Sequence, residues 1–315
     1  MRRIFLALFT ASLVGIALIF GAGEVLSRAA AQPAGSPPPE LHASDVRIPS
    51  SPSGTVAGWF TQGTPGCGTV LLLHGVRSNR IQMSPRAKRL HANGYSVLLI
   101  DLPAHGESSG DQITFGAREG AGVLAALSYL RRQMPNERIG VIGVSLGAAA
   151  IVLSRPSPPA DAVVLESMYP SIAEAIANRM AMRLGSFGVR AAPLLLWQLP
   201  LRLGIQADEL RPIDAIAELG SPVLIASGTR DQHTPWAETE SIFAAATQPK
   251  ELWAVEGAKH VDLYSFDPIA YESTVFRFLH QHLRGKPRLL IQADKKPDAT
   301  TCQASQQSLT QVSNP

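Results

Sequence analysis

The sequence predicts an α/β domain built on a mainly parallel sheet, with a helical insertion between two of its strands. Short apolar runs alternate with longer amphipathic stretches over residues 45–285. The apolar residues in these runs are continuous and do not alternate with polar ones, as expected of parallel strands that are buried on both faces. One long interval lacks such a run and carries only helical periodicity, which indicates an insertion.

The predicted elements follow one another in regular alternation. The main strands are Thr69–Leu73, Ser96–Ile100, Arg138–Ile142, Ala162–Leu165, Val223–Ala226 and Glu251–Val255. Two further runs, Val46–Ile48 and Thr55–Phe60, are expected to add antiparallel strands at one edge. The helical stretches between the strands are Gln82–Asn93, Ala117–Gln133, Leu146–Leu153, Ala237–Ala246 and Pro268–Leu283. Alternation of this kind is typical of a parallel sheet covered by helices.

The insertion is predicted over about residues 167–219, as a helical cap on the carboxyl edge of the sheet. It holds two apolar helical stretches, Ile172–Leu184 and Ala192–Leu203. Its large apolar side chains are Met180, Met182, Leu184, Phe187, Leu194, Leu195, Leu196, Trp197 and Leu199. They are interpreted as packing the cap onto the core. An apolar substrate pocket and contact with a membrane are the alternatives.

Residues 1–31 are interpreted as a targeting segment. A charge-free run from Ile4 to Gly23 follows Arg2 and Arg3, and small residues extend to Ala31. An uncleaved transmembrane helix is one interpretation, because a span needs roughly 20 apolar residues. A secretory signal cleaved near Ala31 is the other. Both predict an exported protein, either membrane-anchored on the periplasmic or extracellular side or secreted.

The remaining chain is divided into three parts. Residues 32–44 are rich in proline and predict an extended linker, and residues 45–285 form the folded domain. Residues 286–315 lose periodicity and predict a disordered tail. Cys67 and Cys302 either pair in an exported compartment or remain two free thiols.

Composition excludes several classes of protein. The 315 residues hold 28 Lys and Arg against 25 Asp and Glu, a net charge of +3 that is too small to indicate nucleic-acid binding. Two cysteines exclude a disulfide scaffold and a four-cysteine zinc site. No metal site is predicted.

The candidate nucleophile is Ser145. It is the centre of Gly143-Val144-Ser145-Leu146-Gly147, a G-x-S-x-G pattern that follows a predicted strand and opens a predicted helix. Such a strand–turn–helix lifts the serine hydroxyl above the sheet edge, and the glycines make room for the close strand and helix. A serine needs a base to take its proton, so a histidine and an orienting carboxylate are expected nearby.

His260 and Asp231 are the predicted partners of this serine. His260 directly follows the late strand Glu251–Val255, and Asp231 follows the strand Val223–Ala226. Both therefore lie on loops at the carboxyl edge, and the chain order serine, aspartate, histidine is the one expected for this architecture. Asp262 is a rival carboxylate, but its place two residues from His260 gives awkward geometry.

A pair of backbone donors is predicted for the oxyanion. His74-Gly75-Val76 follows the strand Thr69–Leu73, so the N–H groups of Val76 and Leu146 are expected to converge near Ser145. Each such donor typically lowers a barrier by about 3 kcal/mol.

With these motifs in order, the sequence resembles the α/β-hydrolases. Further matching motifs are Asp101-Leu102-Pro103-Ala104-His105-Gly106 and Gly228-Thr229-Arg230-Asp231. Within the superfamily it is most similar to the Bem46-like and prolyl-oligopeptidase-like serine hydrolases. The resemblance implies a doubly wound, eight-stranded sheet, no cofactor, and a triad of Ser145, Asp231 and His260 with Val76 and Leu146 as oxyanion donors.

The function expected from these residues is serine-dependent hydrolysis of an acyl ester or thioester through an acyl-enzyme. The partner is a small acyl substrate, which the apolar cap predicts to be lipophilic. Two alternatives stay open: a serine peptidase acting on small peptides, and a non-catalytic exported binding protein on the same fold.

Overall fold

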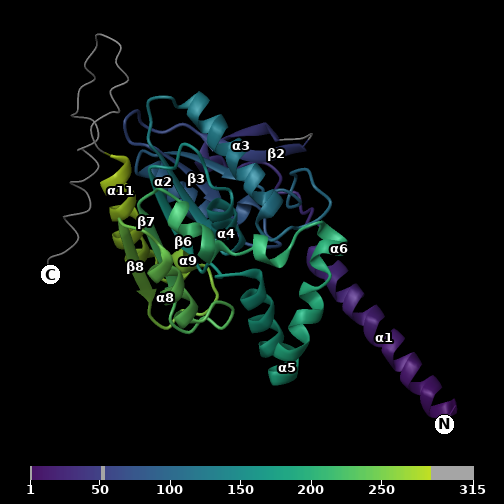
Figure 1. Ribbon diagram of the computed structural model, residues 1–315. Coiled ribbons are helices and arrows are strands. Elements are labelled where there is room, and N and C mark those ends of the chain that lie inside the picture. The colour runs from purple at the N-terminus through teal and green to yellow at the C-terminus, as the bar shows by residue number, and fades with distance from the viewer. Residues whose placement is uncertain (1, 51–53, 285–315) are drawn as a thin grey trace.

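The structure is a computed structural model that describes residues 2–50 and 54–284 (Figure 1). Its centre is an eight-stranded sheet in the order β1-β2-β4-β3-β5-β6-β7-β8. The strands are β1 (Ser44–Ser50), β2 (Gly54–Thr61), β3 (Thr69–Leu73), β4 (Ser96–Ile100), β5 (Ile139–Val144), β6 (Ala162–Glu166), β7 (Val223–Gly228) and β8 (Lys250–Val255). β2 is antiparallel to β1 and β4, and all other neighbours are parallel. The predicted fold class is confirmed.

Helices cover both faces of the sheet because successive strand residues point to opposite sides. Leu71 and Leu73 of β3 pack in one core with α3 (Ala117–Gln133), α4 (Leu146–Leu153) and α8 (Trp236–Ala245). Val70 and Leu72 pack in the other with α2 (Ser84–Ala92) and α11 (Arg277–Leu283). The short α9 (Leu263–Phe266) and α10 (Pro268–Tyr271) precede α11, and residues 272–276 between α10 and α11 form a π-helix.

The insertion between β6 and β7 is helical, as predicted. It consists of α5 (Ile172–Leu196), α6 (Leu199–Leu203) and α7 (Pro212–Ala215). Gly185 breaks α5 with φ +58° and ψ −144°, and the two halves project from the sheet as a hairpin (Figure 1). Its predicted packing holds for part of the apolar set only: Leu195 and Leu199 are buried, whereas Met182, Leu184, Phe187, Leu194 and Trp197 are exposed.

The N-terminal run forms α1 (Arg2–Ser27). In the described ranges, no helix combines the length and the apolar character that a membrane span requires. The predicted transmembrane helix, and with it the membrane contact and the membrane-anchored location, is therefore wrong. The prediction rested on the length of a charge-free run. In the structure, the insertion binds the end of this helix: Gln198 Nε2 donates to the Ile19 carbonyl at 3.0 Å, and Arg202 pairs with Glu24.

The segment predicted to contain a cleavage site runs along the domain. Ala30 is buried, its N–H donates to the Ala104 carbonyl at 2.8 Å, and its carbonyl accepts the Gly106 N–H at 2.9 Å. Cys67 is buried, whereas Cys302 and the predicted disordered tail lie outside the described residues.

Candidate active site

Ser145 stands at the turn between β5 and α4. Its backbone has φ +50° and ψ −105°, a conformation that is rare for a residue with a side chain. The turn is tight, because a Cβ on Gly143 would lie 2.6 Å from the Ala148 nitrogen and one on Gly147 would lie 2.6 Å from the Leu73 carbonyl oxygen. Only glycine fits at these two positions, which explains the flanking glycines of the motif.

The sheet register brings the chain segments of the site together. Leu73 of β3 pairs with Gly143 of β5, and Val144 pairs with Glu166 of β6. The residues that follow these pairs therefore meet at the carboxyl edge. The Ser145 N–H donates to the Glu166 carbonyl at 2.8 Å, which fastens the turn to β6.

A cavity of about 280 Å³ opens at this edge. Its lining residues are Gly75, Val76, Ser78, Gln82, Val144, Ser145, Ser167, Arg179, His233, His260, Val261 and Asp262. The Ser145 side chain is buried, and its Oγ makes no hydrogen bond to any residue that the structure describes. The serine hydroxyl is thus available to a molecule in the cavity and shares that cavity with His260.

His260 and Asp231 form a hydrogen-bonded pair. Nδ1 of His260 donates to Asp231 Oδ2 at 2.7 Å, which leaves the lone pair of Nε2 for an incoming proton. The Asp231 carboxylate also accepts the N–H groups of His233 and Thr234 at 2.7 and 3.0 Å and the Thr234 hydroxyl at 2.8 Å. Burial acts to raise the pKa of Asp231, but the hydrogen bond and charge of His260 and the Thr234 donors hold that pKa below its usual value.

His233 lies beside the histidine–carboxylate pair. Its N–H bond to Asp231 joins two residues that are close in the chain. Its ring also lies against the His260 ring, with centroids 4.6 Å apart, and lines the cavity. Burial and the nearby His260 lower the pKa of His233.

The loop after β3 is held by its own side chains. His74 Nδ1 donates to the Gly75 carbonyl at 2.7 Å, and Gln82 Oε1 accepts the Gly75 N–H at 2.9 Å. A trans peptide points its N–H opposite to its C=O, so fixing the Gly75 carbonyl also fixes the Val76 N–H. That N–H makes no hydrogen bond within the described chain. Leu146 is the first residue of α4, so its N–H has no acceptor within the helix.

The rival carboxylate has a different partner. Asp262 forms an ion pair with the buried Arg86, whose guanidinium also donates to Glu166 Oε2 at 2.6 Å and to the Tyr271 hydroxyl at 3.0 Å. Burial acts to raise the pKa of Asp262, and Arg86 lowers it below its usual value. No spacing in the sequence signals this cluster, because its members come from distant segments.

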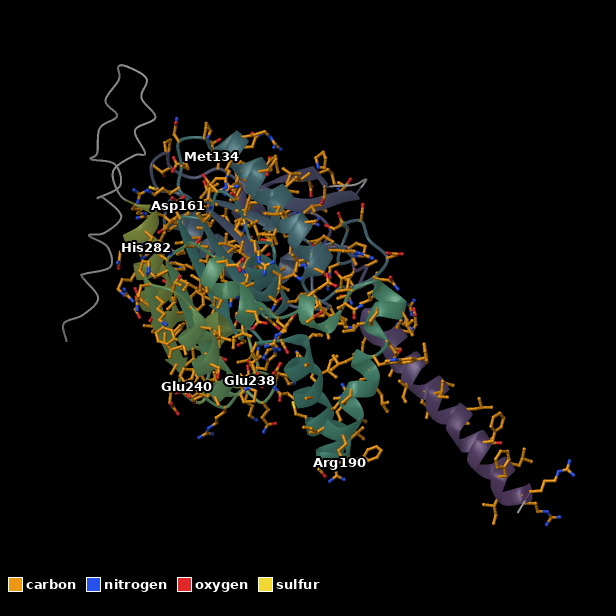
Figure 2. The ribbon with its side chains drawn as sticks, viewed as in Figure 1. Met134, Asp161, Arg190, Glu238, Glu240 and His282 are labelled. Atoms are coloured by element: carbon orange, nitrogen blue, oxygen red, sulfur yellow. The ribbon has the colours of Figure 1, made fainter. Side chains whose placement is uncertain are left out.

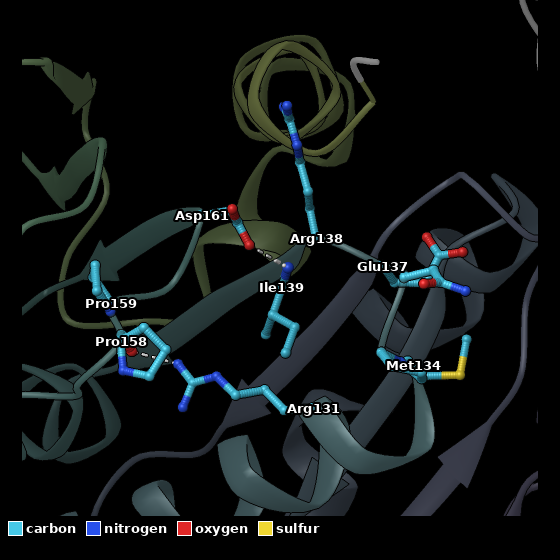
Figure 3. Close-up of a pocket in the computed structure, with 10 residues that line it drawn as sticks. Arg131, Met134, Glu137, Arg138, Ile139, Pro158, Pro159 and Asp161 are labelled. Carbon is cyan, nitrogen blue, oxygen red and sulfur yellow. Dashed lines mark hydrogen bonds between the residues drawn. The ribbon is translucent and has the colours of Figure 1, made fainter. Parts of the chain in front are cut away.

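Two other features bear on where a ligand could bind. No group of three or more His, Cys, Asp and Glu side chains suited to a metal occurs among the described residues. A smaller hollow of about 110 Å³ lies beside Arg131, Pro158 and Asp161 at the start of β5 (Figure 3). It is at the amino ends of the strands, opposite the edge that carries Ser145.

A serine at a strand–helix turn, with a histidine–carboxylate pair on the same sheet edge, is the arrangement that defines the class of α/β hydrolases. Residues 70–272 match the family model described as the alpha/beta hydrolase family. The chain therefore belongs to the α/β-hydrolase family. The narrower resemblance to the Bem46-like and prolyl-oligopeptidase-like branches stays a prediction.

Individual relatives agree with this assignment. The chain is 32% identical to the protein Rv2307c of Mycobacterium tuberculosis over 263 residues, which covers 82% of this chain and 84% of that protein. It is 28% identical to YqkD of Bacillus subtilis over 239 residues, covering 74% and 77%. Among solved structures, the esterase Pf2001 of Pyrococcus furiosus superposes with a TM-score of 0.67 at 24% identity, covering 80% of this chain and 98% of that one. Family and fold together support a hydrolase.

Proposed function

We propose that this protein is a serine hydrolase that cleaves a carboxylic ester or thioester by way of an acyl-enzyme. Ser145 is the nucleophile, His260 the general base and acid, and Asp231 the carboxylate that orients the base. One observation carries the proposal. The unpartnered Ser145 hydroxyl shares a cavity with His260, whose Nδ1 is bound by the buried Asp231.

The reaction needs water as its only co-reactant and proceeds in two steps, acylation of Ser145 and hydrolysis of the acyl-enzyme. His260 Nε2 takes the Ser145 proton as Oγ attacks the acyl carbon, and the N–H groups of Val76 and Leu146 bind the oxyanion. The C–O or C–S bond to the leaving group breaks, and His260 returns the proton to the alcohol or thiol. Water then attacks the acyl-enzyme with help from the same base and releases the acid.

The substrate is a small molecule, in keeping with a cavity of about 280 Å³. The apolar cap residues that led to the expectation of a lipophilic acyl group are not among the lining residues. That expectation therefore stays a prediction without a contact to support it.

Labelling by a fluorophosphonate probe tests the proposal. The folded wild type should be labelled, Ser145→Ala should not, and Asp231→Asn and His260→Ala should be labelled at least ten times more slowly. Ser227→Ala is the matched control, because Ser227 is another buried serine outside the cavity lining. Labelling that persists in Ser145→Ala would refute the assignment of the nucleophile.

Turnover of different substrates distinguishes an esterase from a peptidase and from a non-catalytic binding protein. Acyl esters and thioesters should be hydrolysed, whereas aminoacyl amides should not. Activity on amides alone would replace the esterase proposal by a peptidase. A folded wild type that is neither labelled nor active would favour a binding protein on this fold.

A further inference from the structure

The cavity beside Ser145 has a polar lining and a single guanidinium. Its lining includes three valines, and the other side chains with functional groups are serines, histidines, Gln82, Asp262 and Arg179. The only carboxylate among them, Asp262, is already paired with Arg86. Arg179 therefore gives the cavity a cationic side that no lining carboxylate neutralises.

The Arg179 guanidinium has unused donors. Its Nη1 donates to the Ala175 carbonyl one turn earlier in α5, at 2.8 Å, and within the described ranges this is its one hydrogen bond and it has no ion pair. Arginine carries five N–H donors and stays charged in proteins. Two carboxylates, Asp231 and Glu238, act on it by charge but form no ion pair with it among the described residues. Asp231 binds His260, and Glu238 binds Asn178 through Oε1.

Burial makes this unpaired cation costly. Desolvation lowers the pKa of Arg179, and the more distant charges of Asp231 and Glu238 only partly offset the effect. A half-buried charge without a partner is unfavourable unless an opposite charge binds beside it. An anionic ligand group in the cavity would supply that charge.

Ser167 provides a second, independent observation. It follows β6, is 3% exposed, and its Oγ has no hydrogen-bond partner among the residues described. Its φ of +48° is unusual for a residue with a side chain, and its N–H is tied to the Ala226 carbonyl at 2.8 Å. Strained backbone with an unsatisfied buried hydroxyl in a ligand cavity is typical of a binding position.

We propose that Arg179 and Ser167 form a subsite for a carboxylate group on the substrate, so that the enzyme prefers anionic esters over neutral ones. The proposal rests on the function proposed for Ser145. The guanidinium fork and the hydroxyl would each donate to the carboxylate oxygens. The volume of the cavity limits the substrate to a short ester that carries the charge a few atoms from the scissile bond.

Paired esters test this preference. Monoethyl glutarate is compared with ethyl glutaramate, its neutral amide isostere, and carboxymethyl butyrate is compared with its amide, so that the charge is placed on the acyl or on the alcohol side. The wild type should favour the anionic member of at least one pair by about 10- to 100-fold in kcat/KM, the range expected of charge-assisted hydrogen bonds. Arg179→Met should bring that ratio close to one, and Arg179→Lys and Ser167→Ala should lower it partly.

Arg190→Met is the matched control. Arg190 lies in the second half of α5, near the tip of the hairpin (Figure 2), and is not among the residues that line the cavity. Its replacement removes the same charge and should leave the ratio unchanged. Equal kcat/KM for both members of each pair in the wild type would overturn the subsite and leave the hydrolase proposal intact.

Binding measured without turnover tests the subsite even if the proposed hydrolase function is wrong. Ser145→Ala should bind monoethyl glutarate more tightly than ethyl glutaramate by calorimetry, and adding Arg179→Met should abolish the difference. If the wild type hydrolyses nothing but this difference is found, the subsite stands and the proposed function fails. If Ser145→Ala binds both esters equally, the subsite is refuted whether or not the enzyme is active.

Discussion

His74 makes the stability of the protein depend on pH in a way that one substitution can isolate. In the folded protein the side chain is fully buried, Nδ1 donates to the Gly75 carbonyl, and Nε2 accepts the Leu102 N–H at 3.0 Å. A second proton on Nε2 would face that N–H donor. Burial and the nearby His105 accordingly lower the pKa of His74 from 6.5 to about 3, against a smaller opposing effect of the Gly75 carbonyl.

The sign of the effect follows from this depressed pKa. Between pH 6.5 and about 3, the unfolded chain binds one more proton at His74 than the folded protein. The stabilising contribution of neutral His74 is complete above pH 6.5 and is lost as the pH falls through this interval. Each pH unit there is worth about 1.4 kcal/mol, so the wild type should lose about 2 kcal/mol from this group between about pH 6.0 and 4.5.

Urea unfolding of the wild type and His74→Asn across this range measures the effect. The variant lacks the titrating ring, so the difference in unfolding free energy should shrink by about 2 kcal/mol from about pH 6.0 to 4.5. Above about pH 7 the two curves should run parallel, which serves as the internal control. A constant difference over the whole range would show that His74 is not held neutral, and would remove the argument that it fixes the Gly75 carbonyl.

Three further predictions concern the burial of ion pairs, the turn at Ser145 and the titration of Asp231. Glu166→Gln removes a charged partner of a fully buried arginine and should lower the unfolding free energy by about 3–5 kcal/mol in urea. Glu251→Gln, in an exposed pair, should cost less than about 1 kcal/mol, and equal losses would contradict the difference in burial. Gly147→Ala should disrupt the nucleophile turn and abolish probe labelling, because its Cβ would lie 2.6 Å from a strand carbonyl, whereas Gly21→Ala meets no atom within 4 Å and should be labelled normally. The pKa of Asp231 is lowered in the folded protein, so its carboxylate stabilises the fold above the usual value of 3.8, and this stabilisation is lost as the pH falls through the lower folded pKa. The difference in unfolding free energy between the wild type and Asp231→Asn should therefore shrink in acid. A difference that grows in acid would refute the direction of the shift.

The inner strands β3 to β7 were predictable because they are buried on both faces. β3 and β4 consist of the residues that the apolar runs indicated, since no polar side chain interrupts them. β7 extends two residues beyond the predicted strand, to Ser227 and Gly228. The prediction missed these residues because they carry no hydropathy signal, although both are buried inside the sheet. Hydropathy also favoured a membrane anchor, because it depends only on neighbouring residues in the chain. It cannot report that Gln198, far away in the sequence, binds the N-terminal helix.

The candidate site was predictable where a residue follows a strand. Ser145, Asp231 and His260 each lie just beyond a strand of the same parallel sheet, so their proximity follows from topology alone. Arg179 could not be found in this way. Its place in the cavity depends on the direction in which α5 leaves the sheet edge, and no motif encodes that direction.

One buried cation links the two halves of the proposed machinery. Arg86 donates to Glu166, whose carbonyl accepts the N–H of Ser145, and it also pairs with Asp262, two residues after His260. A shift of either segment would break one of the two ion pairs of this fully buried guanidinium, and a buried charge that loses a partner is strongly destabilising. The strained turn at Ser145 and the loop that carries His260 are therefore held in register by the same guanidinium. Precise placement of this kind is what general base catalysis requires, because the proton must cross a single hydrogen-bond distance.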